Sequence, residues 1–330
     1  MPESLALLIL VVIAAIGFGI ANGFNDAANA IATVVGTRTL SPRAAIIMAA
    51  FCNFAGAATG TAVAMTIGKG IVAPEALTLS TVVAGAGAII IWAVVLTHYG
   101  MPISLTHGLV AGLVGAGIAI SGSETIVWGV LTKVISAVGV APLMGFAGGF
   151  LLMVVIMWLF RRSAPDKVRG IFGNLQVISA AFMAYSHGKN DGQMPIGLIC
   201  MALMVYYGWG EFQIPFWVVA VSAASISLGT AIGGWRVIRT LGLKITTLRP
   251  VHGFAAEASA ATVIEVASHF GIPVSTTHCI STSVMGVGAT SRLSAVRWGI
   301  AGDIVLTWIL TFPACGILGW FIALLLKIAF

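Results

Sequence analysis

Asn22-Gly23-Phe24-Asn25-Asp26-Ala27-Ala28-Asn29-Ala30 follows an apolar run at residues 4–21 and leads into a second apolar stretch. It places a carboxylate and several amide side chains inside what we predict to be a membrane segment. Such groups are costly in hydrocarbon, and there they usually mark a functional site. We expect Gly23 to interrupt the helix and to free backbone groups for a cavity.

The composition identifies the class of protein. Of 330 residues, 59% are hydrophobic and 8% are charged, and the mean hydropathy is +1.07. Soluble domains carry about 25% charged residues, so we predict an all-α polytopic protein in a lipid bilayer. The basic residues behind the net charge of +6 lie in short loops, which argues against a nucleic-acid partner. Residues 1–21 lack the basic start of a signal peptide and are interpreted as a retained first segment.

The polar stretch has a second copy further along the chain. His187-Gly188-Lys189-Asn190-Asp191-Gly192-Gln193 repeats the Asn-Asp pair 165 positions after Asp26. Gly60-Thr61-Ala62 likewise matches Gly229-Thr230-Ala231. These ordered matches predict an internal duplication.

A third match is longer and contains hydroxyl residues. Met101-Pro102-Ile103-Ser104-Leu105-Thr106-His107 parallels Ile272-Pro273-Val274-Ser275-Thr276-Thr277-His278. We therefore divide the chain into a first repeat at 1–160, a cytoplasmic connecting loop at 161–170 and a second repeat at 171–330.

Loop charge indicates how the repeats are oriented. Arg38 and Arg43 follow the first polar stretch, whereas the loop after the second contains Glu211 and no basic residue. The segment 236–249 is basic, but its counterpart at 69–79 is not. Because basic loops stay cytoplasmic, we predict two inverted-topology repeats with the N-terminus outside. This scheme does not place Arg292 and Arg297.

The two proline motifs suggest an anion site. Proline disfavours helix in the residue before it and favours a new helix after it. Hydroxyls and free N–H groups at a helix N-terminus bind oxyanions, so two such tips can surround a tetrahedral anion. Residues 80–120 and 251–290 would then be re-entrant hairpins beside broken helices, as in secondary transporters. The candidate anion ligands are Ser104, Thr106, Ser275, Thr276, Thr277, Asp26, Asp191 and Gln193.

The two aspartates would repel an anion unless a cation accompanies it. We therefore expect Asp26 and Asp191 to hold a co-transported Na⁺ or H⁺, with neutral oxygens from nearby amides. The candidate cation ligands are Asp26, Asn25, Asn29, Asp191 and Asn190, with Na⁺ at Asp26, Asn29, Asp191 and Asn190. The alternative is that these carboxylates only bridge helices.

Four further residues are candidates for gating or accessory roles. They are Glu257, His107, His278 and Lys189. The simpler alternative is packing for the histidines, and for Lys189 a side chain that reaches the membrane surface.

These motifs resemble the signatures of the inorganic phosphate transporter (PiT) family. The matching stretches are Asn25 to Ala30 with Ala32 and Thr33, His187 to Gln193, and Pro273 to His278. The resemblance spans both repeats and implies a duplicated inverted fold, phosphate symport with Na⁺ or H⁺, a homodimer, and the prokaryotic inner membrane. Leu105 departs from the pattern, because family members usually carry a hydroxyl residue there.

Two alternative functions stay open and one is disfavoured. Some similar bacterial proteins are sulfate permeases, and an uncoupled anion channel would share the same polar site. The chain contains no His-Glu-x-x-His and no Gly-x-Ser-x-Gly motif, so we expect no enzyme activity and no cofactor beyond the co-transported ion.

Overall fold

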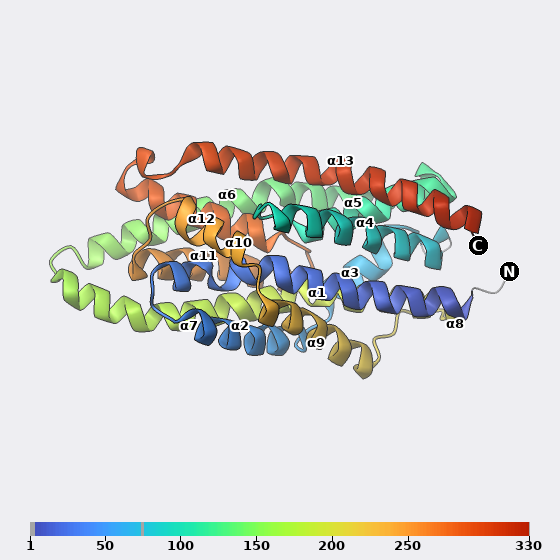
Figure 1. The fold of residues 1–330 in the computed structure, drawn as a ribbon, viewed down its shortest axis with the longest axis horizontal. Helices are drawn as coiled ribbons and strands as arrows, with labels where there is room; N and C mark the ends of the chain where they lie inside the picture. The colour runs from blue at the N-terminus through green and yellow to red at the C-terminus, as the bar shows by residue number, and fades with distance from the viewer. Residues whose placement is uncertain (1–3, 74–75, 330) are drawn as a thin grey trace.

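The computed structural model describes residues 4–73 and 76–329 and is built from helices (Figure 1). Within these described residues, four helices are long and apolar enough to cross a membrane, or six segments if each of two bent helix pairs counts as one span. The elements are α1 (Leu5–Gly36), α2 (Pro42–Ala57), α3 (Ala62–Gly70), α4 (Leu79–His98), α5 (Leu105–Ser121), η2 (Ser123–Thr125), α6 (Trp128–Leu159), α7 (Pro165–Asp191), α8 (Gln193–Tyr207), α9 (Phe216–Ile232), α10 (Trp235–Arg239), η3 (Thr240–Lys244), α11 (Pro250–His269), α12 (Thr276–Ser291), η4 (Leu293–Ala295) and α13 (Trp298–Ala329).

The element order reproduces the duplication. Helices α4 and α11 have 20 residues each, and α6 and α13 have 32 each with an internal proline, Pro142 or Pro313. The bent pairs α2–α3 and α9–α10/η3 turn by 69° and 63°. Equivalent long helices run in opposite directions in Figure 1, with α6 leading away from the end where α13 finishes. This is the arrangement that an inverted duplication predicts.

The expected helix break at Gly23 is wrong, because α1 continues without interruption from Leu5 to Gly36. Gly23 instead allows a close approach of α1 to α9. A Cβ atom there would lie 2.0 Å from the carbonyl oxygen of Ile226. The second copy does break, since α7 ends at Asp191 and α8 begins at Gln193.

Packing corrects one of the repeat matches. Gly188, the counterpart of Gly23, approaches the carbonyl of Asn53 on α2 in the same way, at 2.2 Å for an added Cβ. The contacts are reciprocal: Gly56 on α2 lies against the backbone of α7, and Gly229 on α9 lies against the backbone of α1. The structural partner of Gly229 is therefore Gly56, not Gly60, and the counterpart of Asn53 is Ile226.

The basic loops gather at one end of the molecule. A pocket there is lined by Thr37 after α1, Arg169 near the start of α7 and Arg249 before α11. Arg297 donates to the carbonyls of Leu243 and Lys244, so it lies at this end too. Both chain termini lie near the opposite end (Figure 1).

The apolar core has two main parts, one toward each end. On α1, Phe18 belongs to one cluster and Ala28 to the other. On the α7–α8 segment, Ala184 and Met194 are divided in the same way. Asp26 and Asp191 fall between these pairs, so the polar residues form a layer between two apolar regions.

Candidate functional site

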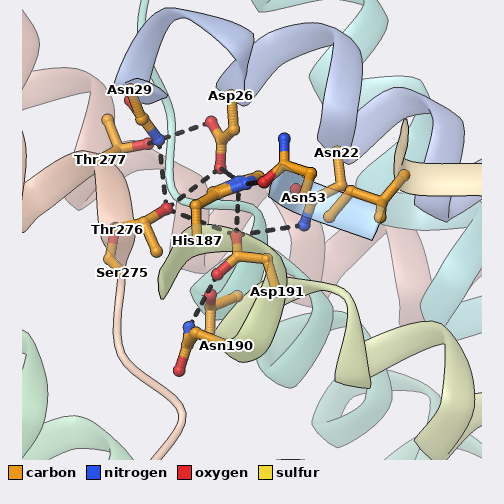
Figure 2. Close-up of polar contacts among 12 residues, drawn as sticks. Asn22, Asp26, Asn29, Asn53, His187, Asn190, Asp191, Ser275, Thr276 and Thr277 are labelled. Carbon is orange, nitrogen blue, oxygen red and sulfur yellow. Dashed lines mark hydrogen bonds and ion pairs between the residues drawn. The ribbon is translucent and has the colours of Figure 1, made fainter. Parts of the chain in front are cut away.

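Asp26 and Asp191 meet in the middle of the molecule. Asp26 lies inside the continuous helix α1, and Asp191 is the last residue of α7, directly before the break at Gly192. Each residue is 1% exposed. The two aspartates come from equivalent positions of the two repeats, and they share one buried centre (Figure 2).

The tip of the α11–α12 hairpin is the third part of this centre. Ser275 caps α12, because its hydroxyl accepts from the backbone N–H of His278 at 3.2 Å. The Thr276 hydroxyl lies 3.4 Å from Oδ2 of Asp26 and 3.4 Å from Oδ2 of Asp191. The Thr277 hydroxyl donates to Oδ1 of Asp26 at 3.1 Å. As predicted, proline precedes a fresh helix N-terminus whose hydroxyls face the carboxylates.

Amide side chains surround the same oxygens. Asn29 donates to the hydroxyls of Thr276 and Thr277 at 3.1 and 2.9 Å. Asn190 donates to Oδ1 of Asp191 at 2.7 Å, and Asn22 donates to Oδ2 of Asp191 at 3.3 Å. The side-chain carbonyl oxygens of Asn22 and Asn29 are buried without a hydrogen-bond partner. Neutral oxygens of this kind are ligands that hard cations prefer.

His187 completes the centre, and the sequence did not single it out as a ligand. Its Nε2 lies 3.7 Å from Asp26 Oδ2 and 3.6 Å from Asp191 Oδ2. Its Nδ1 lies 2.8 Å from Oδ1 of Asn53 on α2 (Figure 2). Asn53 was also missed, although an amide in an otherwise apolar helix is a recognisable signal.

The centre carries more negative than positive charge. One oxygen of each aspartate and the His187 nitrogen all lie within 4.8 Å of one another. Two carboxylate charges at that separation repel by about 3–4 kcal/mol at an effective dielectric constant of about 20. Among the described residues, no lysine or arginine pairs with either aspartate. The arrangement is therefore suited to a cation.

The tip of the first hairpin, between α4 and α5, contacts the tip of the α11–α12 hairpin but not the carboxylates. Ser104 caps α5 by accepting from the N–H of His107 at 3.2 Å. Thr106 donates to the carbonyl of Val274 at 3.2 Å, and Asn190 donates to the same carbonyl at 2.8 Å. The two tips are therefore in contact, and the second contributes the hydroxyls nearest to the aspartates.

Three predicted residues make their contacts elsewhere. Asn25 points to α4 and donates to Thr97 at 2.6 Å. Gln193 accepts from the N–H groups of Val63 and Ala64 at 2.9 and 3.2 Å, so it caps the N-terminus of α3. Lys189 forms an ion pair with Glu265 at a partly exposed position.

Glu257 lies in a separate buried cluster. Thr33 and Ser179 donate to its two carboxylate oxygens, and Gln176 donates at 3.3 Å. Gln176 in turn accepts from Thr37 and Thr39 at 2.8 and 2.7 Å. This chain of contacts leads from Thr33 on α1 toward the end with the basic loops, because Thr37 lines the pocket with Arg169 and Arg249.

His107 and His278 pair with each other. Their ring centroids are 4.9 Å apart, and both rings are buried. His107 stacks on Phe312 and His278 packs on Trp308, with centroid distances of 5.2 and 3.8 Å. The contact between the two rings links the first turn of α5 to the first turn of α12.

Comparison with known proteins gives a consistent set of relatives. A sequence profile described as "Phosphate transporter family" matches residues 22–319. A Rhizobium meliloti (strain 1021) protein named "Probable low-affinity inorganic phosphate transporter" is 44% identical and covers 94% of each chain. A Bacillus subtilis (strain 168) protein of the same name is 42% identical over 96% of each.

A solved structure gives the same result. It is titled "The sodium-dependent phosphate transporter", and it superposes with a TM-score of 0.93 at 26% identity. The match covers 99% of this chain and all of that one. The similarity therefore extends over the whole fold.

Proposed function

The chain belongs to the phosphate transporter family, and from this premise we propose that it is a symporter that couples phosphate uptake to Na⁺. It is an integral membrane protein, and its relatives are transporters rather than enzymes. The observation that carries the proposal is the Thr276 hydroxyl, 3.4 Å from a carboxylate oxygen of each repeat. One hydroxyl hydrogen cannot satisfy two carboxylates at once, so a cation between them completes the site.

In this proposal the cation and the anion depend on one another. Asp26 and Asp191 hold Na⁺ with the unpartnered side-chain carbonyls of Asn29 and Asn22, and the ion offsets part of their charge. Asn190, also expected as a ligand, turns its carbonyl oxygen to Ser268 and supports Asp191 through its amide group. Phosphate then binds at the hydroxyls and N–H groups of the second tip, where the positive end of a helix dipole favours an anion. The sodium-dependent relative supports Na⁺ as the driving ion. Phosphate is favoured over sulfate because the named relatives are phosphate transporters.

We propose the same orientation that the loop charges predicted. The end with Arg38, Arg169 and Arg249 faces the cytoplasm, and the N-terminus lies outside the inner membrane. The repeats at 1–160 and 171–330 rock against each other around the buried centre, with 161–170 as their cytoplasmic link. We also propose a homodimer, as the resemblance to the family implied.

Roles outside the centre follow from the contacts. Glu257 lies on the cytoplasmic side of Asp26, and we assign it to the inward path of the ions. His107 and His278 hold the two tips together. Ser104, Thr106, Asn25, Gln193 and Lys189 support the helices around the site, and Ser104 and Thr106 join the anion site if the tips move.

Reconstituted protein provides the test. Proteoliposomes with an imposed inward Na⁺ gradient should accumulate labelled phosphate, and a proton gradient alone should not replace it. Excess sulfate should compete weakly. Accumulation driven equally by a proton gradient would contradict sodium coupling. Preferential uptake of sulfate would contradict phosphate as the substrate. Phosphate flux that does not depend on any ion gradient would indicate a channel.

A further inference from the structure

His187 presents an unpaired imidazole nitrogen to two carboxylates. The side chain is 0% exposed, and its Nε2 has no hydrogen-bond partner. The nitrogen faces Oδ2 of Asp26 at 3.7 Å and Oδ2 of Asp191 at 3.6 Å. A buried nitrogen aimed at two acidic oxygens requires a physical explanation.

The hydrogen bonds behind the ring indicate its tautomer. Thr230 donates its hydroxyl hydrogen to the carbonyl of Ile226 at 2.9 Å, so its oxygen is free to accept from Asn53 Nδ2 at 2.8 Å. Asn53 therefore turns its carbonyl oxygen toward His187, and Nδ1 of the ring donates to it. A neutral imidazole has only one N–H, so Nε2 carries a lone pair that points at the carboxylates.

This is the arrangement of a metal-binding histidine. Histidine ligands usually donate their second ring N–H to an oxygen, which fixes the ring and its tautomer. Hard ions such as Na⁺ and Mg²⁺ prefer oxygen alone, whereas imidazole favours transition metals and zinc. Ligand atoms around a tetrahedral Zn²⁺ are about 3.4 Å apart. The two nitrogen–oxygen separations here, 3.7 and 3.6 Å, are a few tenths of an ångström longer, and the two carboxylate oxygens lie within 4.8 Å of each other.

We propose that His187, Asp26 and Asp191 form a binding site for a borderline divalent cation such as Zn²⁺ or Co²⁺. Asp26 and Asp191 occupy equivalent positions of the two repeats, but the first-repeat counterpart of His187 is Asn22, an amide. The nitrogen ligand is therefore a property of one repeat only. The inference deepens the proposed function and rests on it in one respect, namely that the divalent cation competes with Na⁺ at Asp26 and Asp191.

Cobalt binding tests the site directly, without transport. The purified full chain in detergent is titrated with Co²⁺ in buffer free of sodium and phosphate, and the visible absorption of the ion is followed. We expect one saturable equivalent with the intense bands of a low-coordination site, displaced by Zn²⁺ and weakened by Na⁺. His187→Gln should weaken binding at least about tenfold, and Asn53→Ala by about 10–100-fold.

The matched control is His269→Gln, because His269 is exposed and lies outside the centre. This variant should bind Co²⁺ like the unmodified chain. Unchanged affinity and spectrum in a folded His187→Gln protein would overturn the proposal, and so would the lack of a saturable equivalent in the unmodified chain. If His187→Gln does not fold, X-ray absorption of the zinc-loaded unmodified chain decides, since a spectrum without imidazole scattering overturns the site.

The two proposals fail separately. Sodium-driven phosphate uptake by a chain that does not bind Co²⁺ would contradict only the divalent site. Saturable Co²⁺ binding through His187 in a chain without phosphate uptake would contradict only the proposed transport function.

Discussion

The acid centre and the Glu257 cluster are both buried and polar, but only the first has partners in both repeats. Asp26 and Asp191 are equivalent residues, and they share the Thr276 hydroxyl. Glu257 instead corresponds to Ala86 in the first repeat, which is a buried apolar residue. Its donors Thr33, Ser179 and Gln176 correspond to Leu198, Ala14 and Val11.

In the proposed transport cycle, this difference separates a centre that both repeats build from a cluster that lies on one side of it only. A site used by both conformations must be available to both repeats, and equivalent residues provide that. The Glu257 cluster lies only between the centre and the end with the basic loops, so we expect it to affect ion movement toward that end alone. The molecule therefore combines a shared centre with an asymmetric polar route toward the basic end.

The largest effect is expected at the shared centre. Asp26→Asn or Asp191→Asn preserves size but removes the charge that the cation requires, so concentrative phosphate uptake should fall to the level of empty liposomes. The control is Asp303→Asn, because Asp303 is exposed on α13. A stable Asp26→Asn protein that keeps the original sodium dependence would remove this residue from the coupling site.

A smaller effect, on phosphate binding, should distinguish the second hairpin tip from the first. Thr276→Ala should weaken phosphate binding by about 1–3 kcal/mol, the usual cost of an unsatisfied buried partner. Thr106→Ala should weaken phosphate binding by a smaller free energy, because Thr106 donates to the Val274 carbonyl and not to an aspartate. Calorimetry with both purified variants measures the difference, and a larger loss at Thr106 would locate the anion nearer to the first tip.

Glu257→Gln sharpens the comparison between the two clusters. The amide keeps the shape and part of the hydrogen bonding, but it removes a charge from the polar contacts between the centre and the basic end. We expect an uptake rate about tenfold lower, equivalent to about 1.4 kcal/mol in the barrier, with little change in phosphate affinity. Initial rates and equilibrium binding should be measured on the same preparation. Equal losses in rate and affinity would mean that Glu257 belongs to the binding site.

The smallest effect is expected at the Lys189–Glu265 ion pair. The side chains are 19% and 28% exposed, and partly exposed pairs contribute about 0–1 kcal/mol to stability. Glu265→Gln should therefore leave sodium-driven uptake unchanged and shift the thermal midpoint only slightly. A loss of uptake comparable to that of Glu257→Gln would show that acidic charge anywhere on α11 matters, and would remove the distinction between the clusters.

The sequence was informative wherever the signal was local. Polar residues in an apolar run identified Asp26 and Asp191. The proline–hydroxyl motifs predicted a new helix after Pro102 and after Pro273, and both are confirmed by α5 starting at Leu105 and α12 at Thr276. Both signals depend only on neighbouring residues.

Features that depend on helix packing were missed or misread. Gly23 was expected to break α1, but its role is contact with α9, and a sequence does not show which helices touch. The bond from His187 to Asn53 joins residues 134 positions apart, so neither residue could be assigned a partner beforehand. Asn25 and Asn29 have the same side chain, yet only helix rotation directs Asn29 to the tip and Asn25 to Thr97.

The most direct test of the shared centre is the linkage between sodium and phosphate binding. Phosphate affinity of the purified chain should be measured by calorimetry over a range of sodium concentrations, and sodium affinity over a range of phosphate concentrations. Each ligand should strengthen the other by the same factor, because a coupling free energy is reciprocal. In Asp191→Asn the dependence should disappear while the fold is retained. Phosphate affinity that is independent of sodium in the unmodified chain would contradict a common site built from Asp26, Asp191 and the tip of α12.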